Sequence, residues 1–337
     1  MKYFLKIFTV AFLVFVILFS GVFLAFNTFM KDSQAYVPVD REEDEHFAEE
    51  EIYIEDDLQR AVVNSNRVNF VLLGLEGPRS DSIMFVSFDP DNGGLDIISI
   101  PRDTYYPRVG YEGLGKKKIN AVYGDHGAEG VKEVVSDILW GIPVDYYVTV
   151  TYKGAEAIVN SIGGVPVTIP SPGMYYRDDY DNPPLVINFP PGPRVLNGAD
   201  AVKFLRYRKP SPGSGGLDRH GDLGRIKAQQ EFIQAALEKA LKLGNIPGLV
   251  ATSFRHVRTD ITLQEAMKYG KDAMGIKMSN VTMRTLPGED RYQGGLSYFF
   301  HSVKETRELL LDIYGARDEN TESEEINDME TVMDSQR

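Results

Sequence analysis

Four charged residues lie at the edges of apolar runs in one short part of this 337-residue chain, Glu76, Arg79, Asp81 and Arg102. An arginine guanidinium makes paired hydrogen bonds to phosphate oxygens, and carboxylates are hard oxygen ligands for Mg²⁺. The combination predicts a site for a phosphate-bearing ligand. Glu76 and Asp81 are the predicted ligands for Mg²⁺, with Mn²⁺ as an alternative ion.

More basic residues lie at the predicted ends of later elements, namely Lys118, Arg206, Arg208, Arg219 and Arg225. Arginines that converge from strand and helix ends suit a pyrophosphate. A helix that begins near Asp222 could add free N–H groups to the same site. The alternative for each residue alone is a solvated charge or a weak surface ion pair. Asp103 is a candidate proton acceptor, although it could equally brace Arg102.

Short apolar runs divided by glycine, proline, asparagine and aspartate predict strands, and runs with helical spacing predict helices. The alternation of the two predicts an α/β fold, layered α-β-α, with a mixed central sheet covered by helices. Residues 171–197 and 209–219 are predicted to be surface loops, the first around a short strand at 185–189. The predicted strands are 68–75, 83–88, 95–100, 146–150, 165–169 and 281–286, and the predicted helices are 129–140, 154–161, 198–207, 222–244, 263–274 and 299–314.

The formal net charge of −13 is unevenly distributed along the chain. Residues 40–57 hold 11 acidic side chains and residues 318–337 hold 8, so residues 58–316 are close to neutral. The absence of cysteine excludes a disulfide framework, a thiolate zinc site and a cysteine nucleophile. The acidic segments predict solvated tails on a folded domain that does not repel anionic ligands.

The N-terminal segment from Phe4 to Phe29 is almost uninterrupted apolar sequence. About 20 such residues are enough for a helix to cross a bilayer. A cleaved signal peptide is the alternative, but its apolar core is shorter, about 7–15 residues, and residues 27–30 are a poor cleavage site. Lys2 and Lys6 precede the span, which predicts a cytoplasmic N-terminus and a single-pass protein of the cell membrane.

These features predict four segments. Residues 1–30 form a cytoplasmic stub and a transmembrane helix, and residues 31–60 an acidic extracellular linker. Residues 61–316 form one extracellular catalytic domain, and residues 317–337 an acidic disordered tail. The acidic chain has no helix-turn-helix with a basic face, so no nucleic acid is expected as a partner.

Seven motifs resemble the LytR-CpsA-Psr family in sequence and order, and together they cover about residues 68–243. They are RSDSIM (79–84), SIPRDTY (99–105), KINAVY (118–123), GIPVDYYV (141–148), IGGVPV (162–167), LNGADAVKFLRYR (196–208) and GDLGRIKAQQ (221–230). One such motif would be weak evidence, whereas seven in order identify the chain as a member of the family.

The resemblance implies a membrane-anchored phosphotransferase. It would move an anionic glycopolymer, such as teichoic acid or capsule, from a polyprenyl pyrophosphate carrier to a peptidoglycan sugar hydroxyl. It also implies that Asp81 takes part in Mg²⁺ binding and that the pyrophosphate is held by Arg79, Arg102, Arg206, Arg208, Arg225 and Gln229. Glu76 stands where the family commonly has an aspartate. Two alternatives stay open, a pyrophosphohydrolase at the same site and a non-catalytic receptor for lipid-linked polyanions.

Overall fold

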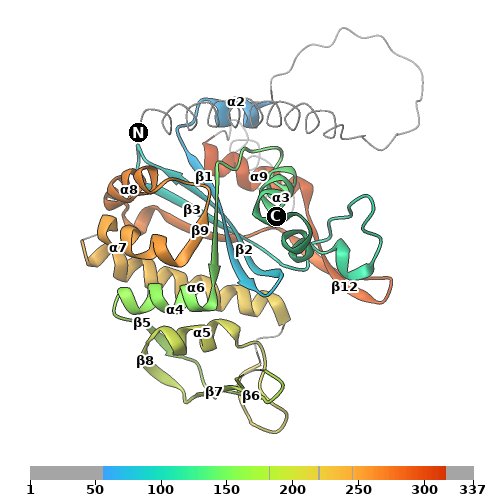
Figure 1. Ribbon diagram of the computed structural model, residues 1–337. Coiled ribbons are helices and arrows are strands. Elements are labelled where there is room, and N and C mark those ends of the chain that lie inside the picture. The colour runs from blue at the N-terminus through green and yellow to red at the C-terminus, as the bar shows by residue number, and fades with distance from the viewer. Residues whose placement is uncertain (1–55, 182, 219–220, 245, 316–337) are drawn as a thin grey trace, which may run out of the picture. The chain divides into compact units, whose positions relative to one another are not determined.

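The computed structural model describes residues 56–181, 183–218, 221–244 and 246–315 (Figure 1). The predicted transmembrane helix, nearly all of the acidic linker and the acidic tail lie outside these residues. Within them, no helix combines the length and the apolar character needed to cross a bilayer.

A six-stranded mixed sheet forms the centre of the domain, in the order β10-β3-β2-β1-β4-β9. The pairs β1/β2, β2/β3 and β4/β9 are antiparallel, whereas β1/β4 and β3/β10 are parallel. The predicted mixed α/β fold is therefore confirmed. The strands are β1 (Val68–Glu76), β2 (Arg79–Asp89), β3 (Gly94–Ile100), β4 (Tyr146–Thr151), β9 (Val257–Thr259) and β10 (Val281–Thr285).

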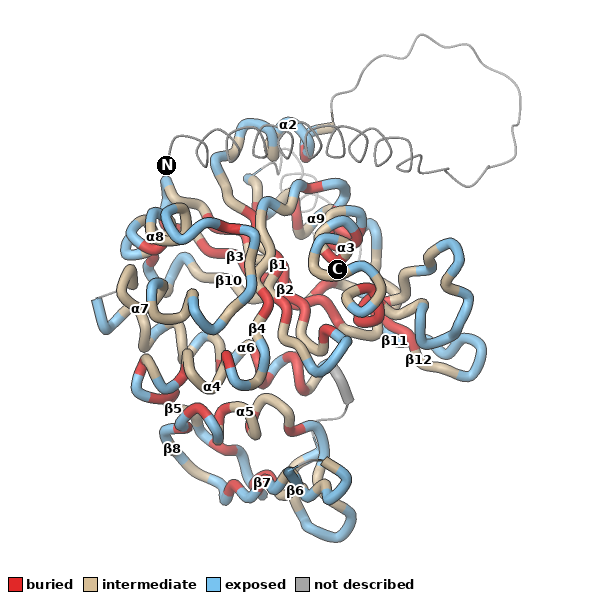
Figure 2. The backbone as a smooth tube through the Cα atoms, viewed as in Figure 1, coloured by how far each residue is buried: buried red, intermediate tan, exposed pale blue. Residues whose placement is uncertain are grey.

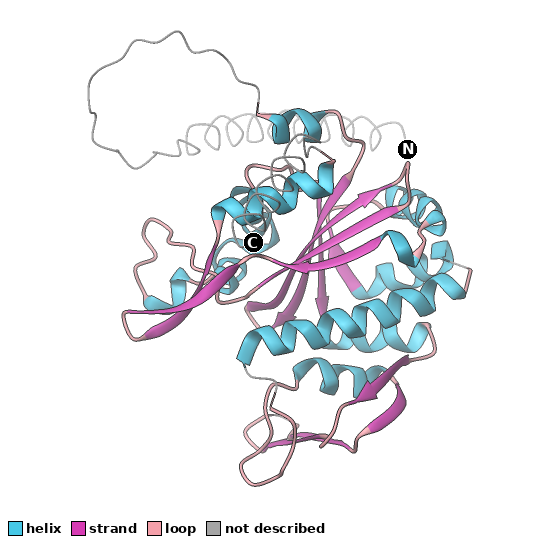
Figure 3. Ribbon diagram, turned by 180° about the vertical axis from the view of Figure 1, so that it is seen from behind, coloured by secondary structure: helices cyan, strands magenta, loops and turns pink. Residues whose placement is uncertain are grey.

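Helices cover both faces of this sheet (Figures 1 and 3). Successive side chains of a strand point to opposite faces. In β1, Val71 and Leu73 therefore enter the core beneath α2 (Asp57–Val63), α3 (Val122–Ile138) and α9 (Val303–Tyr314). Phe70 and Leu72 face the opposite way, toward α6 (Gly221–Lys242) and α8 (Leu263–Asp272). Buried residues run along β1, β2 and β3 in the middle of the sheet (Figure 2).

A smaller layer packs on the outer side of α6 and α4 (Tyr152–Ser161) around a second apolar core. The prediction of a loop with one strand at 171–197 is wrong in part, because strands also form on both sides of 185–189. Paired backbone amides satisfy hydrogen bonds that a loop would leave to water. This layer contains β5 (Val165–Ile169), β6 (Met174–Asp178), β7 (Leu185–Phe189), β8 (Gly192–Leu196) and α5 (Gly198–Arg206), with α7 (Ile246–Ser253) beside α4 and α8.

The predicted helix at 299–314 is also wrong in part, because its first residues belong to β12 (Leu296–His301), which pairs with β11 (Gly288–Gln293). Aromatic residues favour strands, and the Ser302 side chain accepts a hydrogen bond from the Glu305 amide, so α9 begins only at Val303. At the N-terminal boundary of the domain, α2 begins at Asp57, before the predicted boundary at residue 61.

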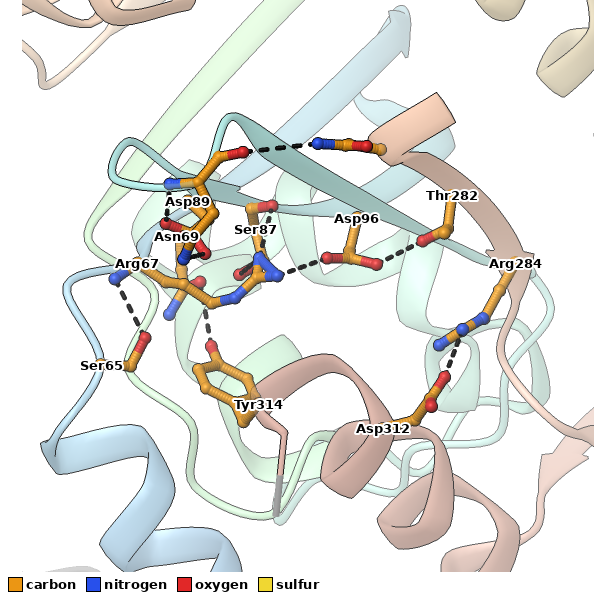
Figure 4. Close-up of polar contacts among 12 residues, drawn as sticks. Ser65, Arg67, Asn69, Ser87, Asp89, Asp96, Thr282, Arg284, Asp312 and Tyr314 are labelled. Atoms are coloured by element: carbon orange, nitrogen blue, oxygen red, sulfur yellow. Dashed lines mark hydrogen bonds and ion pairs between the residues drawn. The ribbon is translucent and has the colours of Figure 1, made fainter. Parts of the chain in front are cut away.

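A network of polar side chains lies at the end of the sheet where β1 begins (Figure 4). Arg67 Nη2 lies 2.6 Å from Asp96 Oδ2 on β3, and Thr282 on β10 donates a hydrogen bond to the same carboxylate. The Tyr314 hydroxyl donates to Asn69 Oδ1, 3.1 Å away. These contacts tie β1, β3, β10 and the end of α9 together, at the opposite end of β1 from Glu76.

Candidate functional site

The turn between β1 and β2 sets the position of Glu76. Gly77 and Pro78 form a two-residue turn that brings Glu76 opposite Arg79. Gly77 has a φ of 59°, a left-handed conformation that glycine adopts without steric cost and that tight hairpins need at this position. Glu76 therefore stands at the last paired position of β1, at the carboxyl-terminal end of this central strand.

A β-bulge directs Asp81 into the site. Gly74 pairs with Ser82 and Leu75 pairs with Ser80, so Asp81 is the extra residue of β2. A bulge places two neighbouring side chains on nearly the same side of a sheet. As a result, Asp81 and Ser82 both line one cavity.

Two arginines from distant segments meet at Asp81. Arg102 follows β3, and its Nη1 lies 2.5 Å from Asp81 Oδ1, with both side chains 17% exposed. Arg225, near the start of α6, is 5% exposed and donates a hydrogen bond from Nη2 to the main-chain oxygen of Asp81, 3.1 Å away. Both cations are therefore held at the bulge before any ligand binds.

Helix α6 presents Gln229 one turn after Arg225, on the same face. Gln229 is 7% exposed and accepts a hydrogen bond from Ser82 Oγ at 3.3 Å. The next residue, Gln230, fixes the helix to the sheet, because its Nε2 donates to Ser99 Oγ and to the main-chain oxygen of Arg284, each 3.0 Å away.

Arg206, the last residue of α5, joins two elements of the site. Its Nη2 lies 3.1 Å from Glu76 Oε1 on β1, and its Nη1 lies 2.9 Å from Asp181 Oδ2 in the β6–β7 loop. The ring of Tyr152 lies against the same guanidinium, with Cζ 4.9 Å from the ring centroid. Tyr152 is the first residue of α4, whose N-terminus is capped by Thr151.

These residues surround a cavity of about 650 Å³ between the sheet, α4, α5 and α6. Its walls divide by chemistry. The polar part contains Glu76, Asp81, Arg102, Arg206, Arg208, Lys209, Arg225 and Gln229. The apolar part contains Leu72, Met84, Val150, Ile158, Val159, Leu205, Phe232, Ile233 and Ala236. The cavity can thus accept an amphiphile with an anionic head and a hydrocarbon tail.

The two carboxyls differ in electrostatics. Burial raises the pKa of Glu76 above its ordinary value, and a hydrogen bond with Asp81 and the charge of Asp81 add to this. Burial also acts to raise the pKa of Asp81, but hydrogen bonds from Glu76 and Arg102 and the charges of Arg102 and Arg225 outweigh it, so its pKa is lowered. Glu76 therefore holds a proton more readily than Asp81, and the pair can share one.

Seven of the predicted site residues line this cavity, Glu76, Asp81, Arg102, Arg206, Arg208, Arg225 and Gln229. Three others do not. Arg79 is exposed at the start of β2, and Asp103 pairs instead with Lys118 at 2.9 Å. Arg219 lies outside the described residues. The structure places seven residues at the cavity, and the roles predicted for all eleven residues stay predictions.

The sequence prediction missed Tyr152 and Asp181. Tyr152 had a usable signal, because it directly follows β4, which lies parallel to β1. Residues after the carboxyl ends of neighbouring parallel strands meet at one edge of a sheet, so Tyr152 belongs beside Glu76. Asp181 lies in a loop, and nothing in its local sequence relates it to Arg206.

A family model supports this picture. The model of the LytR_cpsA_psr family matches residues 23–312. The chain belongs to the LytR_cpsA_psr family. The match extends over nearly the whole described domain, so the family resemblance of the seven motifs is confirmed.

One relative is the polyisoprenyl-teichoic acid--peptidoglycan teichoic acid transferase TagV of Bacillus subtilis (strain 168). It is 30% identical over 226 residues, which cover 66% of this chain and 55% of TagV. This member of the LytR_cpsA_psr family therefore spans about half the length of TagV.

Solved structures share the fold. The crystal structure of B. subtilis TagV has a TM-score of 0.60 and 26% identity, covering 75% of this chain and 98% of the crystallised one. The LytR-CPS2A-psr family protein YwtF (TagT) with bound octaprenyl pyrophosphate lipid has a TM-score of 0.54 and 24% identity, covering 74% and 90%. The mixed sheet with its helical layers is thus the fold of family members of known structure.

Proposed function

We propose that this chain is a phosphotransferase that moves an anionic glycopolymer, such as a teichoic acid, from a polyprenyl pyrophosphate carrier to a peptidoglycan sugar hydroxyl. One observation carries the proposal, the cavity whose arginine-rich polar part adjoins an apolar part. A prenyl pyrophosphate has the same division between a charged head and a hydrocarbon tail. The name of TagV describes the same chemistry for a 30% identical protein.

The residues of the site suit this transfer. The acceptor hydroxyl oxygen forms a bond to the phosphorus that carries the glycopolymer, and the bond from that phosphorus to the bridging oxygen breaks. The electrons of the broken bond leave with the prenyl phosphate, and the proton of the acceptor hydroxyl passes to an oxygen of that phosphate. Arg102, Arg206 and Arg225 stand where they can stabilise the charge that develops on these oxygens, which is the main source of catalysis in phosphoryl transfer. The apolar wall holds the prenyl chain.

Glu76 and Asp81 fit a magnesium ion. Among the described residues no cluster of three or more His, Asp or Glu side chains could hold a metal alone. Mg²⁺ does not require one, because it commonly binds through one or two carboxylates plus substrate phosphates and water. Glu76 and Asp81 act on each other's pKa, so the two carboxyls lie close together and a cation between them would relieve their mutual repulsion. A bound Mg²⁺ would neutralise phosphate charge, and Mn²⁺ could do the same.

We also propose that residues 4–29 anchor the chain in the cell membrane, with the N-terminus in the cytoplasm and the catalytic domain outside. This arrangement would keep the site near a membrane-borne prenyl carrier. Protease treatment of intact cells tests it, because the domain should be degraded while a cytoplasmic marker survives. Protection of the domain in intact cells would contradict it.

The transfer itself can be assayed with the full-length chain, a lipid pyrophosphate-linked oligosaccharide and peptidoglycan fragments. We expect phosphodiester-linked product with the natural sequence, and a loss on the order of 100-fold with Arg102→Ala, as for removal of a charge-stabilising group. Arg291→Ala is the matched control, because Arg291 pairs with Glu289 on the β11–β12 ribbon and does not line the cavity.

Each alternative has its own outcome in this assay. Release of the oligosaccharide to water in the presence of acceptor would favour a pyrophosphohydrolase. Tight, salt-sensitive binding without turnover would favour a receptor. Absence of product together with an indifferent Arg102→Ala variant would remove the transferase from consideration.

A further inference from the structure

Tyr152 contacts Arg206 through the face of its aromatic ring. Its ring faces the Arg206 guanidinium, with 4.9 Å between Cζ and the ring centroid, and the side chain lines the cavity. The guanidinium is planar, and its five N–H donors lie in its plane, whereas an aromatic ring contacts its face. Contact with the ring therefore leaves every N–H of Arg206 available.

The carboxylates that hold Arg206 do compete for those donors. Glu76 and Asp181 each accept from one end of the guanidinium, at 3.1 and 2.9 Å. A phosphate that binds the same ends of Arg206 would displace these carboxylates from them. The contact with the Tyr152 ring uses no N–H group, so it can persist and keep the plane of the guanidinium fixed.

The position of Tyr152 is itself well defined. It begins α4, where the Thr151 hydroxyl accepts from the Gly154 amide at 3.2 Å. At Gly154, an added Cβ would lie 2.3 Å from the main-chain oxygen of His256, so this turn of the helix packs closely against the segment before β9. Burial, followed by the charge of Glu76, raises the pKa of Tyr152, so the phenol stays neutral beside the arginine.

We propose that Tyr152 is a positioning residue of the pyrophosphate site, whose ring holds Arg206 face-on while the edge of Arg206 binds phosphate oxygens. This inference rests on the proposed function. It gives the first residue of α4 a role in binding the pyrophosphate head group, and this role belongs to the aromatic ring and not to the hydroxyl. The ring contacts the cation, and the hydroxyl forms a hydrogen bond with the Glu76 carboxyl.

The experiment is titration calorimetry of the full-length chain in detergent with farnesyl pyrophosphate. We expect Tyr152→Leu, which removes the ring but keeps apolar bulk, to weaken binding by about 3- to 20-fold, the range for a partly desolvated cation–π contact. Tyr152→Phe and Tyr152→Trp keep an aromatic face and should recover most of that loss. Tyr292→Ala, at an exposed tyrosine of β11 outside the cavity, should bind like the natural sequence.

A double-variant cycle separates positioning from general damage. With Arg206→Ala already present, Tyr152→Leu should cause almost no further loss, because its partner is gone. An equal loss with and without Arg206, or equal losses with Leu and Phe, would overturn the inference while leaving the proposed function standing. If the natural sequence itself fails to bind farnesyl pyrophosphate, the proposed function and the inference both fall.

Discussion

Arg102 and Asp81 form an ion pair at the β-bulge of β2, with 2.5 Å between Nη1 and Oδ1. The pair occupies the guanidinium that the proposed transfer would use for phosphate. Without a metal, Asp81 thus competes with an anionic ligand for the Arg102 guanidinium. With Mg²⁺ bound, Asp81 would instead help to hold the ion. The two roles of Asp81 predict opposite effects of one substitution.

Asp81→Asn should strengthen metal-free binding of farnesyl pyrophosphate several-fold, because it removes a competing negative charge from Arg102. The same change should lower Mg²⁺-dependent transfer on the order of 100-fold, as a charge ligand is lost. Calorimetry in a chelator and transfer assays in Mg²⁺ measure the two effects on one preparation. Equal activity of the natural sequence in chelator and in Mg²⁺ would exclude the metal role.

The raised pKa of Glu76 predicts a pH-dependent stability. Because the folded protein holds this proton more tightly than the unfolded chain, the contribution is full below the ordinary value of 4.5 and is lost as pH rises through the folded-state pKa. Glu76→Gln removes this titration. The variant should therefore melt at a higher temperature than the natural sequence near neutral pH, and the difference should shrink toward about pH 4.

Thermal melts at several pH values test this sign. Glu289→Gln is the matched control, because Glu289 is an exposed partner of Arg291 outside the cavity. It should show no such pH-dependent difference. A Glu76→Gln variant that is less stable than the natural sequence near neutral pH would mean that its contact with Arg206 outweighs burial and repulsion from Asp81.

How far the sequence predicts the site depends on how each residue reaches it. The apolar pattern predicts the strands and the helix beside Asp81, Arg102 and Arg225. All three residues lie near the ends of these elements, which is why the sequence could suggest that they share one site. The bulge that turns Asp81 toward the cavity is a matter of pairing register, which no local pattern encodes. Of the strands in the smaller layer, β5 and β7 were predicted, whereas β6 and β8 were missed because residues 171–197 are rich in proline, aspartate and tyrosine.

The apolar wall of the cavity gives a third prediction. Ala236 lines the cavity from α6, and tryptophan at this position would fill space that a prenyl chain needs. We expect Ala236→Trp to weaken farnesyl pyrophosphate binding by about 10-fold or more, roughly the loss of two buried methylene groups. Binding of inorganic pyrophosphate, which has no tail, should change much less.

Lys227→Trp provides the control on the same helix, because Lys227 is exposed and does not line the cavity. It should not affect either ligand. Equal losses of both ligands in Ala236→Trp would point to a displaced α6, with Arg225 and Gln229 moved out of place. If the natural sequence binds farnesyl pyrophosphate and inorganic pyrophosphate with equal affinity, the prenyl chain does not use this wall.

The network at the far end of the sheet predicts an effect on stability alone. The side chains of Arg67 and Asp96 are each 11% exposed. In Figure 4, the Asp96 carboxylate has two side-chain partners, the Arg67 guanidinium and the Thr282 hydroxyl. Arg67→Ala leaves a mostly buried carboxylate without its cation. We expect a loss of about 3 kcal/mol in the free energy of unfolding, measured by urea denaturation. Arg60→Ala, at an exposed pair with Asp57, should cost less than about 0.5 kcal/mol.

The reason for this loss can be checked by removing the charge as well. In the double variant Arg67→Ala, Asp96→Asn, no buried charge is left alone, so part of the stability should return. Arg67 also lies over the Tyr314 ring, 5.7 Å from its centroid, and that contact is lost in both variants. If the double variant is as unstable as Arg67→Ala, the stability comes from this packing of Arg67 on α9, and the ion pair with Asp96 contributes little.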